Sequence, residues 1–226
     1  MTLRSKLVLQ MIVPLMLLGL ALFVPAGTLR FWQAWAFLGV WFIPGIFFSI
    51  YFYKHDKALV QRRLEGKEKL PGQNWLIRAM FVMLLVAFVI PGLDYRFGWS
   101  KQWFGGPPVW LEIASLLVVL AAYLLAIRVM AVNRYAARTI RVEAEQTVVS
   151  TGPYKWVRHP MYSAAVVMFL LVALALGSYV ALPVFLLVIP FFVVRLLSEE
   201  QVLRGELPGY AEYCQGTRYR LVPYLW

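Results

Sequence analysis

Long uncharged stretches alternate with short charged segments along the whole chain. The stretches cover 7–29, 31–53, 75–93 (interrupted only by Arg78), 113–127 and 160–194. A helix needs about 20 apolar residues to cross the hydrocarbon layer of a membrane. The first four stretches therefore each predict one membrane-spanning helix.

The last stretch, 160–194, has a different organisation. It is too long for one crossing and slightly short for two crossings with a turn. Gly177 and Ser178 interrupt it near the middle, and Pro183 and Pro190 are expected to kink its second half. We predict a tight hairpin of two short helices. Because lipid satisfies no freed backbone groups, this hairpin is expected inside the bundle.

The expected fold is all-α, a polytopic integral membrane helix bundle. It should have about five to six transmembrane helices, the last two forming the hairpin. Residues 1–132 are expected to hold the N-terminal transmembrane helices. Residues 133–226 are expected to build a small cytoplasmic site from a loop and the C-terminal tail. Since the sequence has no Gly-x-Gly-x-x-Gly and no Walker loop, nothing indicates a Rossmann or P-loop nucleotide site.

The composition excludes several classes of protein. Hydrophobic residues make up 62% of the 226 residues, charged residues 15%, and the mean hydropathy is +0.69. A water-soluble domain of this size cannot bury so much apolar surface, and a disordered chain would be more polar. The single cysteine excludes a disulfide framework and a multi-cysteine metal cluster. With only two histidines, we predict no metal site.

The net charge of +11 comes mainly from Lys and Arg residues in the loops between the hydrophobic stretches. Basic charge can indicate nucleic-acid binding, but no basic stripe lies outside the loops, so no nucleic-acid partner is expected. With six crossings, 16 of the 22 Lys and Arg residues fall on one side of the membrane and 3 on the other. Because Lys and Arg collect in cytoplasmic loops, both termini are expected to be cytoplasmic. The expected location is the cytoplasmic membrane of a prokaryote.

A loop before the hairpin combines groups that suit a zwitterion. Arg158 and His159 directly precede a helix that would open at Pro160, where free N–H groups favour an anion. The flat faces of Tyr154 and Tyr162 suit a cation. The alternative is a loop at the membrane interface, whose basic residues bind lipid head groups and whose tyrosines anchor the loop in the interface.

A second group of charges lies where the last hydrophobic helix ends. Arg195 and Glu199 are four residues apart and share a helix face. Carboxylates at a helix C-terminus oppose the helix dipole, so Glu199 and Glu200 call for a cation, either Arg195 or a ligand ammonium. Alternatively, both carboxylates are solvated and Arg195 reaches the membrane surface.

Together these features resemble the isoprenylcysteine carboxyl methyltransferase family, part of a wider group that includes phospholipid methyltransferases. The resemblance is carried by Gly-Pro-Tyr-x-x-x-Arg-His-Pro-x-Tyr at 152–162, the hydrophobic hairpin, the Glu-Glu pair, Tyr210-x-x-Tyr213 and Val222-Pro223. It covers roughly residues 130–226. It implies a membrane methyltransferase that uses S-adenosyl-L-methionine without a Rossmann domain, with its cofactor-binding and catalytic region at 133–226.

The resemblance also implies roles for particular residues. Glu199 would hold the amino group of the cofactor, and Arg195 would lie on the substrate side. The remaining residues implied to contact the cofactor are Gln146, Thr147, Val148, Val149, Tyr154, His159, Pro160, Met161 and Tyr162, and the first four form a strand-like stretch. The anion site adds Arg158.

The reaction implied is an in-line methyl transfer, in which positioning and desolvation supply most of the catalysis. A carboxylate acceptor needs no base, and Arg195 could orient it by a bidentate contact. An amine acceptor would need a base, for which Glu200 is the nearest candidate. The expected partners are membrane lipids and a lipid-like acceptor that enters from the bilayer. An isoprenoid acid, a phospholipid amine and a small thiol all stay open.

Two other functions were weighed. A lipid or sterol reductase using NADPH would share Arg-His-Pro, but such enzymes usually continue with Asn-Tyr and Gly-Glu. Here Met161-Tyr162 and Ala164-Ala165 stand instead, which favours the methyltransferase. A transporter or membrane scaffold would predict paired interrupted helices in two halves, whereas only the final hairpin is interrupted.

Overall fold

The computed structural model of the chain describes residues 2–65, 73–133, 135, 142 and 145–226. Every regular element in these residues is a helix. The helices are α1 (Leu3–Ala26), α2 (Trp32–His55), α3 (Lys57–Glu65), α4 (Gln73–Phe97), α5 (Trp99–Phe104), α6 (Val109–Val132), the 3-10 helix η1 (Gly152–Lys155), α7 (Pro160–Ala175), α8 (Leu182–Leu186), α9 (Val188–Glu206) and α10 (Tyr210–Gly216).

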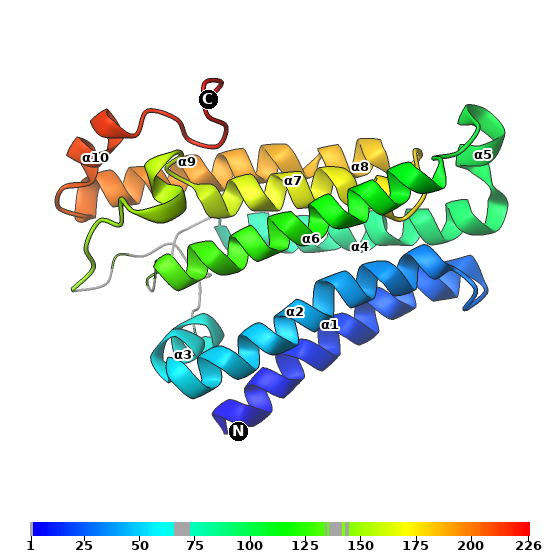
Figure 1. Cartoon of the computed structure of the whole chain (residues 1–226), viewed down its shortest axis with the longest axis horizontal. Coiled ribbons are helices and arrows are strands. Elements are labelled where there is room, and N and C mark those ends of the chain that lie inside the picture. The colour runs from blue at the N-terminus through cyan, green and yellow to red at the C-terminus, as the bar shows by residue number, and fades with distance from the viewer. Residues whose placement is uncertain (1, 66–72, 134, 136–141, 143–144) are drawn as a thin grey trace.

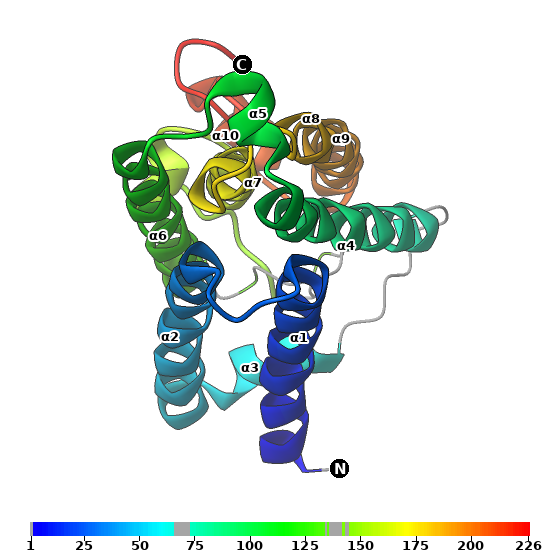
Figure 2. The same cartoon turned by 90° about the vertical axis from the view of Figure 1, so that its right-hand side faces the viewer.

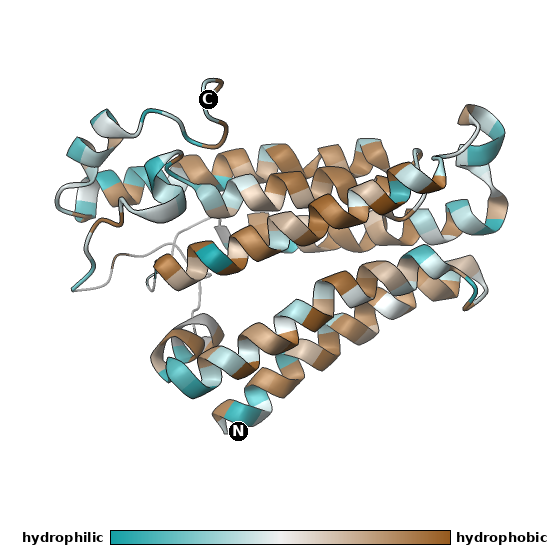
Figure 3. Ribbon diagram, viewed as in Figure 1, coloured by the Kyte–Doolittle hydropathy of each residue, from teal (hydrophilic) through white to brown (hydrophobic). Residues whose placement is uncertain are grey.

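Five helical segments are long and apolar enough to cross a membrane. They are α1, α2, most of α4, α6, and the continuous segment of α8 and α9, each 24 or 25 residues long. The apolar helix α7 is shorter, with 16 residues. The prediction of an all-helical polytopic membrane bundle is thereby confirmed. Figure 3 shows the hydrophobic residues along the long helices and the hydrophilic ones gathered toward their ends.

The chain turns between α7 and α8 at Gly177 and Ser178. Gly177 has φ +73°, a left-handed conformation that costs glycine little. A Cβ there would lie 2.9 Å from Glu112 Oε1, so glycine also leaves room for this carboxylate. The following arm is interrupted at Leu187, between α8 and α9. Pro190 accounts for this interruption, because it has no N–H to donate to the preceding turn.

The long helices run side by side, with the polar connections at two ends. In Figure 1, η1, α3 and α10 lie at one end, and α5 lies at the other. Helices α1 and α2 lie against the bundle at the α5 end and diverge from it toward α3 (Figure 2). Helix α1 packs mainly on α4, and α6 packs mainly on α7. This divergence opens one side of the bundle near α3.

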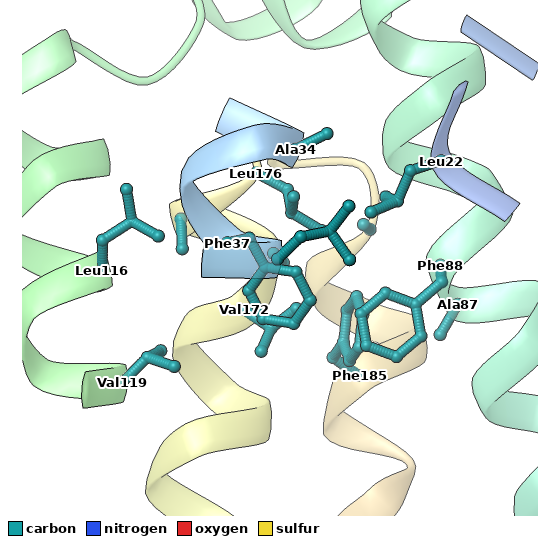
Figure 4. Packing of buried hydrophobic residues seen from close by; sticks show 14 of the residues in the cluster. Leu22, Ala34, Phe37, Ala87, Phe88, Leu116, Val119, Val172, Leu176 and Phe185 are labelled. Carbon is teal, nitrogen blue, oxygen red and sulfur yellow. The ribbon is translucent and has the colours of Figure 1, made fainter. Parts of the chain in front are cut away.

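The core fills the space between α1, α2, α4, α6, α7 and α8. Phe37, Phe88 and Phe185 are almost fully buried and form its aromatic centre. The Phe37 and Phe88 ring centroids lie 5.6 Å apart, and the Phe88 and Phe185 rings meet edge to face at 5.3 Å (Figure 4). Such contacts hold the helices together where lipid offers no hydrophobic driving force.

Helices α1 and α4 approach closely at Gly92. A Cβ at this residue would collide with the carbonyl oxygen of Leu22 and would lie 3.1 Å from Pro25 Cβ. Small residues at helix crossings in membranes allow this kind of backbone contact. Gly92 therefore sets the distance between the two helices.

Buried polar residues tie the helices together at the α5 end. Asp94 accepts hydrogen bonds from the Ser100 backbone N–H at 2.7 Å, from the Ser100 hydroxyl, and from the Ser178 hydroxyl at 2.5 Å. Nearby, Gln33 donates to Glu112 at 3.1 Å. Asp94, Ser100, Ser178 and Glu112 are all at least 95% buried. Asp94, Ser100 and Ser178, the serine clasp, link α4 and α5 to the turn after α7.

Candidate functional site

Three segments meet at the end of the bundle opposite the serine clasp. They are the residues that precede α7, the end of α9, and residues 217–222. The backbone N–H of Arg158 donates to the Tyr219 carbonyl at 2.9 Å, and that of His159 donates to the Arg220 carbonyl at 3.0 Å. The Ser163 hydroxyl donates to the Leu221 carbonyl at 2.6 Å. The C-terminal segment is thus fixed along the start of α7.

The carboxylate of Glu200 lies at the centre of this meeting point. Its Oε1 is 3.1 Å from Arg158 Nη1 and 3.3 Å from His159 Nε2. Its Oε2 is 3.1 Å from Arg220 Nε, while Arg204 lies at 3.9 Å on the exposed side. Glu200, Arg158 and His159 are buried, and Arg220 is half-buried. We call Glu200, Arg158, His159 and Arg220 the Glu200 cluster.

The Glu200 cluster changes the chemistry expected for three of its members, namely Glu200, Arg158 and His159. A carboxylate neutralised by several cations is a weak proton acceptor, so the geometry argues against Glu200 as a general base. The anion site expected at Arg158 and His159 is reduced as well, because Glu200 already contacts both side chains. Arg158 also donates from Nη2 to the Arg218 carbonyl at 3.3 Å. Its Nε–H has no partner among the described residues.

Glu199 lies next to this cluster but makes a different contact. The Tyr162 hydroxyl donates to Glu199 Oε2 at 2.7 Å. The guanidinium of Arg195 interacts with the same hydroxyl. The structure therefore brings Arg195, Glu199 and Tyr162 together, as the four-residue spacing on α9 leads one to expect.

Tyrosines connect the loop before α7 with α6 and α10. Asn133 donates to the Tyr154 hydroxyl at 2.9 Å, and the Tyr213 hydroxyl donates to the Tyr154 carbonyl at 2.8 Å. Burial raises the pKa of Tyr154 well above its usual value and that of Tyr213 to about 12. Both phenols therefore stay neutral near pH 7 and act as hydrogen-bonding groups.

Two buried polar atoms at this end have no partner among the described residues: Arg158 Nε and the Tyr210 hydroxyl. Their residues are 7% and 4% exposed. Buried donors in native proteins are almost always paired, so both atoms are candidates to donate hydrogen bonds to a ligand. Sequence analysis assigned no site role to Tyr210, although this residue is part of the Tyr-x-x-Tyr motif. It gave none to Asn133 or Arg220 either.

The other residues expected in the site differ in exposure. Residues 146–149 belong to a connecting segment outside any helix. Val148 lies 3.8 Å from the position of a Cβ on Gly209, which directly precedes α10. Thr147 is exposed, and Gln146, Val148, Val149 and Met161 are half-buried. Pro160 is buried at the first position of α7. In the part of the chain that the structure describes, no three His, Cys, Asp or Glu side chains form a metal-binding group.

An apolar groove opens where α1 and α2 diverge from α6. Its volume is about 270 Å³, and its walls include Met11, Trp41, Phe48 and Tyr123. Gly45 forms part of the wall next to the Tyr123 hydroxyl.

A row of aromatic rings leads from this groove to the candidate site. Trp41 stacks on Tyr123 and lies 6.3 Å from Phe169 between centroids. Phe169 lies 6.0 Å from Phe192, which lies 5.7 Å from Tyr162. The groove and the Glu199 contact are therefore connected by packed side chains.

The chain is similar to known proteins in part of its sequence and in its fold. Residues 110–205 match the model of the isoprenylcysteine carboxyl methyltransferase (ICMT) family. No curated protein matches the chain significantly. The structure is similar to that of a eukaryotic intramembrane Ras methyltransferase, ICMT, with a TM-score of 0.55 and 18% identity over 92% of this chain and 74% of the other. At this identity the likeness shows a shared fold. Over residues 110–205 the chain is thus similar to the isoprenylcysteine carboxyl methyltransferase family, and it shares its fold with a membrane methyltransferase of that name.

Proposed function

We propose that this protein methylates the carboxylate of a lipid-borne acceptor at the end of the bundle where η1, α9 and α10 meet. The family's reaction is the S-adenosylmethionine-dependent carboxyl methylation of isoprenylcysteine. The observation that carries the proposal is the convergence of Arg195 and Glu199 on the Tyr162 hydroxyl. This point lies between a polar, partly unsatisfied site and the row of aromatic rings from the groove.

The residues at this end fit the cofactor. S-adenosylmethionine, when bound, supplies an electrophilic methyl group on a sulfonium. Glu199 offers a carboxylate for an ammonium, and the two unpaired donors, Arg158 Nε and the Tyr210 hydroxyl, offer hydrogen bonds to a ligand acceptor. We therefore assign cofactor binding to Gln146, Thr147, Val148, Val149, Tyr154, Arg158, His159, Pro160, Met161, Tyr162 and Glu199.

The Glu200 cluster favours a carboxylate acceptor over an amine. An amine must lose a proton during methylation, and Glu200, the nearest candidate base, is shared among cations. A carboxylate attacks without losing a proton, and Arg195 can hold it in a bidentate contact. Arg195 is then the catalytic residue on the acceptor side, and Glu200 fixes the segments around it.

The apolar groove is proposed to hold the chain of the acceptor. It lies between α1, α2, α3 and α6, and its volume suits part of an isoprenoid or acyl chain. The aromatic row from Trp41 to Tyr162 leads from the groove toward Arg195. An acceptor that enters from the bilayer would keep its apolar part in the groove and its carboxylate at the polar end.

The proposed topology places the candidate site in the cytoplasm. Lys and Arg residues gather at the end that carries α3, η1 and α10, as in loops that face the cytoplasm. Both termini would then be cytoplasmic, in the cytoplasmic membrane of a prokaryote. Residues 1–132 would form the membrane part that receives the acceptor, and residues 133–226 the methyltransferase region.

Binding of S-adenosylhomocysteine to the detergent-purified protein, measured by calorimetry, tests the proposal. Glu199→Ala should weaken binding at least tenfold, because the ligand ammonium loses its charged partner. The matched control is Glu206→Ala at the exposed end of the same helix, which should bind like the wild type. Unchanged affinity in Glu199→Ala, or binding of NADPH in place of S-adenosylhomocysteine, would overturn the proposal. Transfer of labelled methyl to S-farnesyl-N-acetylcysteine, but not to phosphatidylethanolamine or a short thiol, would identify the acceptor as a carboxylate.

A further inference from the structure

We propose that the Tyr210 hydroxyl and the Arg158 Nε–H together bind a carboxylate, namely the α-carboxylate at the amino-acid end of the cofactor. This inference rests on the proposed use of S-adenosylmethionine at this end of the bundle. It adds Tyr210 to the binding residues, and it restricts the part of Arg158 that meets the ligand to one edge of the guanidinium.

The first observation is that both donors are buried and unpaired. Tyr210 is 4% exposed and Arg158 is 7% exposed, and neither Tyr210 Oη nor Arg158 Nε has a hydrogen-bond partner among the described residues. A buried donor without an acceptor is unfavourable, since it has lost its water without replacement. Two such atoms at one end of the bundle indicate an acceptor that comes from outside the chain.

The second observation is that Arg158 cannot turn away to find another partner. Its Nη1 is held by Glu200 Oε1 at 3.1 Å, and its Nη2 by the Arg218 carbonyl at 3.3 Å. The backbone N–H of Arg158 is bound to Tyr219 as well. A guanidinium is planar and rigid, so these contacts fix the direction in which its Nε–H donates.

Tyr210 shares this environment. Its phenol lies close enough to Glu200, Glu199 and Arg158 for their charges to act on its ionisation. Burial first, and then the two carboxylates, raise the pKa of Tyr210 far above the usual value. The hydroxyl therefore keeps its proton near neutral pH and remains a donor.

The charges around the two donors select the class of ligand. Two donors, one of them on a cation, match the two oxygens of a carboxylate. A ligand with negative charge alone would be repelled by Glu199 and Glu200. A zwitterion avoids this repulsion, because its ammonium can pair with Glu199 while its carboxylate meets Arg158 and Tyr210. An α-amino acid carries both groups on one carbon.

Calorimetry with three ligands tests the inference. S-adenosylhomocysteine has both groups, its decarboxylated analogue keeps only the ammonium, and 5′-methylthioadenosine lacks both. Tyr210→Phe should weaken S-adenosylhomocysteine about tenfold or more and leave the other two ligands unchanged. The matched control is Tyr213→Phe, one turn later on α10, whose hydroxyl already donates to the Tyr154 carbonyl. Any loss in Tyr213→Phe should be equal for all three ligands.

The stability of the ligand-free protein gives an independent readout. Because the Tyr210 hydroxyl has no partner among the described residues, Tyr210→Phe should unfold at the wild-type temperature or above, while Tyr213→Phe should unfold below it. An equal loss for all three ligands in Tyr210→Phe, or no loss, overturns the inference. So does a variant with unchanged S-adenosylhomocysteine affinity and a raised KM for the acceptor, since the acceptor's carboxylate would then occupy the site. Failure of the wild type to bind S-adenosylhomocysteine would instead refute the proposed function.

Discussion

Replacing Glu200 by glutamine removes one charge and almost no volume from the Glu200 cluster. Arg158 and His159 would then be left buried without their carboxylate partner. Breaking a buried ion pair by removing one partner costs about 3–5 kcal/mol. For a chain of this size each kcal/mol lowers the unfolding temperature by about 2–4 °C, so Glu200→Gln should unfold about 6–20 °C earlier.

The same variant should also bind S-adenosylhomocysteine more weakly. Without Glu200, the guanidinium groups of Arg158 and Arg220 repel each other, and the C-terminal segment loses its charged attachment to α9. Arg220→Gln should have a smaller effect, about 1 kcal/mol, because the Arg220 side chain is 28% exposed. Its loss also leaves the buried pairs of Glu200 in place.

Thermal unfolding followed by tryptophan fluorescence in detergent measures these effects. The matched control is Glu206→Gln, the same chemical change at an exposed position of the same helix, which should stay within about 0.5 kcal/mol of the wild type. If Glu200→Gln and Glu206→Gln unfold at the same temperature, the Glu200 cluster does not hold the segments together and the reasoning fails.

Two further substitutions test the packing and the groove. Gly92→Ala should lower the unfolding temperature, because its Cβ would collide with the Leu22 carbonyl and separate α1 from α4. The matched control is Gly19→Ala, whose Cβ would meet nothing within 4 Å. Equal unfolding temperatures of the two variants would contradict the close approach of α1 and α4. Gly45→Leu should fill the groove beside Tyr123 and so raise the KM for a farnesylated acceptor several-fold. The affinity for S-adenosylhomocysteine should stay unchanged. A parallel loss of cofactor affinity would show that the groove is not a separate acceptor site.

Hydropathy alone predicted the long helices because each crosses lipid with almost no charge. Hydropathy did not predict α3 and α5, because both are short and lie in polar segments that were expected to be loops. Within α3, Leu59 and Val60 are buried against Phe52 and the start of α1. The apolar residues Ala58, Leu59, Val60 and Leu64 were the available signal, but a segment of nine residues is shorter than the window in which a helical period is recognised.

The candidate site was predictable where its residues are close in sequence. Arg195 and Glu199 share a helix face by spacing alone, and the structure brings them to one hydroxyl. The partners of Glu200 were not predictable, because Arg158 and Arg220 come from segments far apart in the chain. Neighbouring helix residues point about 100° apart, so Glu199 and Glu200 meet different surroundings. Their adjacent positions in the sequence do not show which of the two carboxylates faces the cations.

The short length of α7 has a consequence for where the chemistry takes place. With 16 residues and a rise of 1.5 Å each, α7 spans about 24 Å, less than the roughly 30 Å of the hydrocarbon layer. Its two ends carry the Glu200 cluster and the serine clasp, so at least one of these polar groups lies below the level of the lipid head groups. The longer helices around α7 shield it from lipid. Such hydrophobic mismatch makes bilayer thickness part of the geometry of the protein.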